Sequence, residues 1–74
     1  MLPLGLLNSG EKAEVVAHTS GHASSRIEDM GLRTGKAIEI LNNEGRGPLL
    51  IKLDESRIAI CRGMAMKIMV RRIA

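Results

Sequence analysis

The chain has 74 residues, with 11 lysines and arginines against 8 aspartates and glutamates, a net charge of +3, and no phenylalanine, tyrosine or tryptophan. This length holds one small core, so we expect a single domain over residues 1–74. The lack of aromatic residues excludes the usual recognition of proline-rich peptides and of stacked single-stranded bases, which leaves aliphatic contacts, charge or an exposed strand edge.

The first seven residues are apolar, but they resemble neither a signal peptide nor a membrane segment. No basic residue precedes them, and Pro3 and Gly5 interrupt the run. No other apolar run approaches the length of about 18 residues that a membrane helix needs. The single cysteine, Cys61, cannot form an internal disulfide. We therefore expect a cytoplasmic protein with no direct insertion into the membrane.

Further along the chain, apolar residues alternate with polar ones in short runs separated by glycine or polar turns, as in a small antiparallel sheet. The pattern predicts strands over residues 12–18, 36–41, 49–53, 57–61 and about 67–72. The predicted fold class is therefore all-β, or mainly β: an SH3-like barrel of about five strands. A five-stranded OB-type barrel fits nearly as well.

The alternation also assigns faces to the predicted strands. Glu39, Lys52, Arg57 and Ala59 should lie on the outer face. The expected core residues of the three middle strands are Ile38, Ile40, Leu49, Ile51, Leu53, Ile58 and Ile60. With no aromatic residue to fill gaps, we expect the methionines after Gly63 to fill them, with Met64 and Met66 on the buried face of the last strand.

A short helix is expected between the first and second strands. Ser25 and Glu28 have the spacing of a capping box, and Gly31 suits the left-handed conformation that ends a helix. A helix of one or two turns must pack on the barrel and leave a groove beside it. The candidate partner-binding residues on the rim of this groove are Arg26, Met30, Leu32 and Arg33. Alternatively, Met30 and Leu32 seal the mouth of the barrel.

The segment from Arg26 to Gly35 resembles the R-L-x-x-M/L-G-L-x-x-G signature of the FeoA domain. Further agreement with that family lies at Leu4, Gly10-Glu11, Gly47-Pro48, residues 56–62, Ala65 and residues 68–70. The resemblance implies an SH3-like fold and an accessory role in ferrous iron transport, in which the chain binds the cytoplasmic domain of the membrane transporter FeoB. The same domain also ends iron- or manganese-dependent repressors, so a role in transcriptional repression is the alternative.

His18 and His22 are the two histidines and the candidate metal ligands of the chain. Imidazole suits ferrous iron, and it also binds zinc adventitiously. Gly21 and the neighbouring threonine and serine place the pair in a loop, so two polar loop side chains are the simpler interpretation. No cofactor is required by the pattern.

The sequence gives no set of catalytic residues, and we expect no enzyme activity. Cys61 has no histidine near it in sequence to serve as a base, and we expect a buried or half-buried inert thiol. Gly31 and Gly35 flank three residues where a phosphate loop needs four, and Lys36 leads into a strand. These glycines are better explained by helix termination and a tight turn.

The sequence isoelectric point near 9.6 and the Arg71-Arg72 pair leave nucleic-acid binding open as an alternative. The other basic residues are dispersed, which is more typical of a solvated surface than of a nucleic-acid interface. A domain of this size gains little stability from its core alone, so weak homo-oligomers are also expected.

Overall fold

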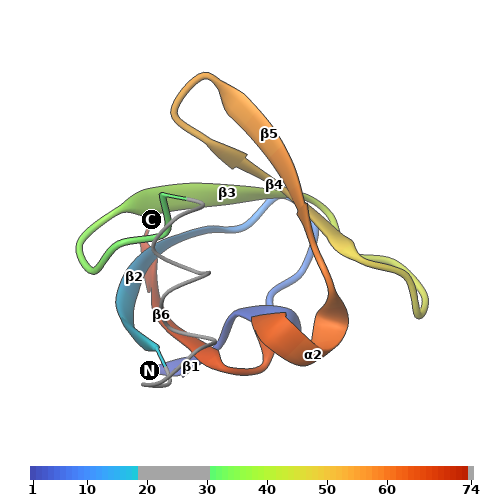
Figure 1. Cartoon of the computed structure of the whole chain (residues 1–74), viewed down its shortest axis with the longest axis horizontal. Coiled ribbons are helices and arrows are strands. Elements are labelled where there is room, and N and C mark those ends of the chain that lie inside the picture. The colour runs from blue at the N-terminus through green and yellow to red at the C-terminus, as the bar shows by residue number, and fades with distance from the viewer. Residues whose placement is uncertain (19–30, 74) are drawn as a thin grey trace.

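The computed structural model describes residues 1–18 and 31–73 (Figure 1). This part of the chain forms strands β1 (Leu2–Pro3), β2 (Lys12–His18), β3 (Ala37–Asn42), β4 (Leu49–Leu53), β5 (Ser56–Ile60) and β6 (Ile68–Ile73), the 3-10 turn η1 (Leu4–Leu6) and the helix α2 (Arg62–Ala65). The predicted mainly β fold is confirmed. The bounds predicted for β2 and β4 are correct, and those of β3, β5 and β6 are shifted by one residue.

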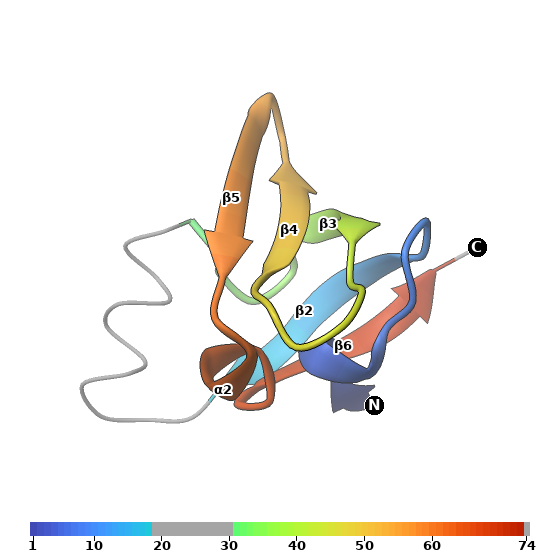
Figure 2. The ribbon, with the colours of Figure 1, turned by 90° about the vertical axis from the view of Figure 1, so that its right-hand side faces the viewer.

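The strands form one antiparallel sheet in the order β1-β6-β2-β3-β4-β5, which places β1 and β5 at its edges. The register shifts between Val15 and Ala17 on β2 and between Ile40 and Asn42 on β3. Such bulges bend a sheet. The β4–β5 hairpin accordingly stands away from the β2–β6 pair, as Figure 2 shows.

The core is entirely aliphatic. Every predicted core residue of β3, β4 and β5 is buried except Ile58, which is half-buried against the same cluster. The remaining members of the cluster come from both ends of the chain and from the strands between them: Leu4, Leu7, Ala13, Val15, Leu32, Ala65, Ile68 and Val70. No polar or charged side chain is buried among the described residues.

Three predictions about residues 61–66, before β6, are wrong. Residues 62–65 form a helical turn, in which the backbone N–H of Ala65 donates to the carbonyl oxygen of Cys61 at 3.0 Å, where the sequence suggested only a corner at Gly63. The side-chain period therefore differs from that of a strand, so Ala65 enters the core while Met66 is 42% exposed. Cys61 precedes the first helical residue and is exposed, where we expected a buried or half-buried thiol.

The helix expected to begin near Ser25 falls in residues 19–30, outside the described residues. Gly31, its expected end, has a φ of 92°, the left-handed conformation that the sequence predicted for it. No helix within residues 1–18 and 31–73 is long and apolar enough to cross a membrane.

Candidate functional site

Two of the four residues expected to rim a partner-binding groove, Arg26 and Met30, lie outside the described residues. Leu32 is fully buried in the core cluster, in agreement with the alternative interpretation, and offers no contact surface. Arg33 is exposed in a turn that the backbone N–H of Lys36 closes by donating to its carbonyl oxygen at 3.0 Å. Arg33 thus keeps its candidate role.

The predicted metal ligands are only partly described. His18 is half-buried at the end of β2, and His22 lies outside the described residues. Within the described ranges no group of three or more histidine, cysteine, aspartate or glutamate side chains is placed to hold a metal ion. The His18 and His22 site stays a prediction.

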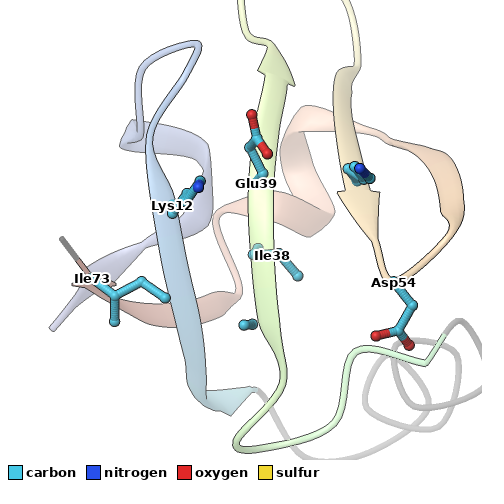
Figure 3. Close-up of a pocket in the computed structure, with 7 residues that line it drawn as sticks. Lys12, Ile38, Glu39, Asp54 and Ile73 are labelled. Carbon is cyan, nitrogen blue, oxygen red and sulfur yellow. The ribbon is translucent and has the colours of Figure 1, made fainter.

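A pocket lies on the outer face of the sheet, over β6, β2, β3 and β4 (Figure 3). Its volume is about 190 Å³, below the ~300 Å³ at which small-molecule sites usually begin. The residues that line it are Lys12, Ala37, Ile38, Glu39, Lys52, Asp54 and Ile73. A shallow hollow lined by both acidic and basic residues suits a side chain of a protein partner better than a cofactor.

Several of the residues that line the pocket belong to one row of side chains that runs across the sheet. Lys12 is the Cα partner of both Ile73 and Glu39, Glu39 is the partner of Lys52, and Lys52 is the partner of Arg57. Because directly opposite residues of antiparallel strands lie on the same face, these five residues form a continuous line, which we call the charge row. From β6 to β5, the charge row consists of the apolar Ile73, the positive Lys12, the negative Glu39, and the positive Lys52 and Arg57.

Asp54, in the turn between β4 and β5, lines one side of the pocket. Asp54 has a φ of 56°, the left-handed conformation that a two-residue hairpin turn requires, and aspartate tolerates it better than most residues. The Asp54 carboxylate pairs with Lys36, with Nζ and Oδ2 2.8 Å apart. The short turn also fixes the register of the hairpin, which brings Arg57 opposite Lys52.

Arg71 and Arg72, the basic pair of the sequence, both have acidic partners on β2 or just before it. Arg71 pairs with Glu14, and Arg72 Nε donates to Glu11 Oε2 at 2.6 Å. The pKa of Glu11 is lowered, first by the hydrogen bond from the backbone N–H of Asn8 and then by the bond from Arg72. The charge of this pair is therefore largely balanced by the protein itself.

The sequence anticipated part of this surface. Alternation correctly placed Glu39, Lys52 and Arg57 on the outer face, and these are three of the five residues in the charge row. It missed the contributions of Lys12 and Ile73, because the pairing of β2 with both β3 and β6 sets their positions. No local pattern specifies the partner of a strand.

The chain matches the family model described as "FeoA domain" over residues 2–72. It is 39% identical over 71 residues to "Putative Fe(2+) transport protein A" of Methanocaldococcus jannaschii, an alignment that covers 95% of this chain and 85% of the relative.

Among solved structures, the crystal structure of an iron uptake regulatory protein, FeoA, is 36% identical, has a TM-score of 0.91, and matches over 97% of each chain. A manganese-dependent transcriptional repressor has a TM-score of 0.86 at 14% identity, and the match covers 96% of this chain and 41% of the repressor. The second likeness shows a shared SH3-like fold alone, whereas the first agrees with the family match along the whole chain. The chain belongs to the FeoA domain family.

Proposed function

We propose that this chain is a cytoplasmic accessory protein of ferrous iron transport, which docks on the cytoplasmic part of the membrane transporter FeoB and assembles or regulates it. The observation that carries the proposal is the FeoA-domain match over residues 2–72, joined by a relative at 39% identity that is described as a ferrous iron transport protein. Ferrous iron is the cargo of the transporter in this proposal.

The exposed surface of the described residues supports a docking role. The charge row crosses five strands of a rigid sheet, and its pocket is too small for most small-molecule ligands. Charges arranged on a rigid face give a protein contact its specificity and its association rate. Arg33 is also exposed and can add a further cation to the contact.

Nucleic-acid binding has weaker support. Such binding needs basic side chains that are free to neutralise phosphates. Arg71 and Arg72 are each engaged by a glutamate, and the charge row contains an acidic residue, Glu39. The likeness to a transcriptional repressor is at 14% identity and extends to the fold only.

The test is direct binding of the full chain to the cytoplasmic domain of FeoB, measured by calorimetry without nucleotide, with GDP and with a non-hydrolysable GTP analogue. Iron uptake is measured in parallel in cells that lack this protein, with and without the gene restored. We expect binding in at least one nucleotide state and reduced uptake in the deletion strain. Normal uptake together with no binding in any state would overturn the proposal.

A further inference from the structure

The two edges of the sheet are built differently. Strand β1 has two residues, one of which is Pro3, so this edge is short and lacks a backbone donor. Strand β5 has five residues, contains no proline, and pairs with β4 in an unbroken register without a bulge. Within residues 1–18 and 31–73, no strand pairs with the outer edge of β5. Among the described residues, one edge is therefore protected against strand addition, whereas the other has no strand paired with it.

The open edge has two chemically distinct faces. Arg57 and Ala59 are exposed on the outer face, whereas Ile58 is half-buried and Ile60 is buried on the inner one. A strand laid along β5 would extend both faces, because side chains alternate along every strand. Its inward residues would meet aliphatic side chains, and its outward residues would meet Arg57.

The charges of the outer face determine which residue suits the position beside Arg57. Along the charge row, Glu39 lies between Lys12 and Lys52, so opposite charges are neighbours. The alternation fails at the edge, where Lys52 and Arg57 are direct cross-strand partners of like charge, an unfavourable arrangement. A carboxylate on an added strand would lie beside Arg57 and give this arginine a neighbour of opposite charge.

We propose that the edge of β5 binds an extended segment of the protein partner by strand addition, with a glutamate or aspartate beside Arg57 and an aliphatic residue beside Ile58. Main-chain hydrogen bonds would supply affinity, and the two side-chain positions would supply specificity. The choice of partner rests on the proposed function, since the segment is taken to belong to the cytoplasmic part of FeoB. The mode of binding itself rests on β5 alone.

A second copy of this chain is a poorer occupant of the same edge. An antiparallel pair of β5 strands centred on Ile58 would place Arg57 opposite Ala59 of the second copy, and one centred on Arg57 would place two arginines opposite each other. Neither register brings a carboxylate to Arg57, and one centred on Ser56, which would bring Glu55 to it, overlaps the two β5 strands only at Ser56. The charge pattern therefore favours a different chain with an acidic residue.

The first experiment uses synthetic peptides of alternating valine and threonine that differ only in one central residue, which is glutamate, glutamine or lysine. Nuclear magnetic resonance of the full chain measures affinity, chemical-shift changes and amide exchange. We expect the glutamate peptide to bind about tenfold more tightly than the lysine peptide. Slower amide exchange should be confined to residues 56–60. If no peptide slows exchange there, or if binding maps to another strand, the proposal is overturned.

The Arg57→Glu variant tests the side-chain part of the proposal and should reverse the peptide order. The variant should fold, because its new carboxylate lies opposite Lys52. Arg46→Glu, an exposed change in the β3–β4 turn, is the matched control and should keep the original order. An unchanged peptide order in Arg57→Glu would contradict the role of Arg57.

Amide exchange of the chain without peptide tests whether something other than a partner segment pairs with the edge of β5. Slow exchange at residues 56–60 in a concentration-dependent dimer would mean that a second copy fills the edge, and slow exchange in a monomer would mean that the chain covers its own edge. Either result would overturn the proposal. A FeoB domain that binds wild type and Arg57→Glu equally would exclude β5 as its site and leave the proposed function intact. If wild type does not bind that domain in any nucleotide state and iron uptake is normal without this protein, the proposed function fails, and the peptides still decide the chemistry of the edge.

Discussion

Arg62 Nη2 donates a hydrogen bond to Asn43 Oδ1 at 2.8 Å and so joins the helix α2 to the loop that follows β3. The Asn43 side chain in turn donates from Nδ2 to the carbonyl oxygens of Gly5, at 3.1 Å, and Leu7, at 2.5 Å. The same Arg62 nitrogen also donates to the carbonyl oxygen of Gly47 at 3.0 Å. One amide therefore connects three segments that are distant in sequence.

Replacing Asn43 with alanine should lower the free energy of unfolding by about 2 kcal/mol. The change leaves two partly buried carbonyl oxygens without their side-chain donor and removes one of the two acceptors of Arg62 Nη2. A partner left unsatisfied costs more than an average hydrogen bond contributes. Urea denaturation measures the loss. Asn42→Ala, at an exposed neighbouring position, is the control and should stay within about 0.5 kcal/mol of wild type. Equal losses in the two variants would contradict the role of Asn43.

Three glycine-to-alanine changes should separate backbone strain from crowding. Gly35 has a φ of 93° with open space at its Cβ position, so Gly35→Ala should cost about 1 kcal/mol from strain alone. Gly31 combines a φ of 92° with a Cβ position 3.1 Å from Leu53 Cδ2, so Gly31→Ala should cost more. Gly47→Ala meets nothing within 4 Å and should cost least. Thermal unfolding of the three variants in any other order would contradict this assignment.

The parts of the fold that local pattern specifies were predictable. Period-two alternation and turn residues identify β2 to β6, and the left-handed Gly31 follows from its place after a capping-box segment. Strand β1 was not predictable, because two residues that include a proline carry no periodic signal, and they become a strand only by pairing with Met69 and Val70. The same limit applies to the hydrogen bond between Asn43 and Arg62, because the two residues are distant in sequence and only the folded chain brings them together.

The exposure of Met66 shows a second limit of pattern. One helical turn between two strands changes the side-chain period from about two to about 3.6 residues, so the strand alternation cannot be carried from β5 into β6. The charge row lies between these cases. Its outer-face residues followed from alternation, whereas the order of charges along it required the strand pairing.

The like-charge pair of Lys52 and Arg57 should make Arg57→Glu more stable than wild type. Replacing a repulsive cross-strand pair with an attractive one should raise the free energy of unfolding by about 0.5 kcal/mol at low ionic strength. Arg57→Ala removes the repulsion without adding attraction and should give a smaller gain. Both gains should shrink in about 1 M salt, where screening acts within ~3 Å. An Arg57→Glu variant less stable than Arg57→Ala would contradict the side-by-side placement of residues 52 and 57.

The hydrogen bonds of Glu11 make the stability of the fold depend on acid. The pKa of this carboxyl is held below its ordinary value of 4.5, chiefly by the backbone N–H of Asn8, which donates to Oε1 at 2.6 Å, and next by Arg72. A lowered pKa means that the folded state favours the ionised form. This contribution to stability is present above pH 4.5 and is lost as the pH falls from 4.5 through the folded pKa.

Two variants divide the causes of that shift. Glu11→Gln should lose stability at neutral pH and show a shallower decrease below pH 4.5, measured by urea denaturation across the acid range. Arg72→Ala should raise the pKa of Glu11 only in part, since the larger contribution, from the Asn8 backbone, is retained. Carboxyl-carbon resonances report that pKa directly. Full return of the pKa to 4.5 in Arg72→Ala would mean that the arginine, and not the backbone of Asn8, stabilises the carboxylate.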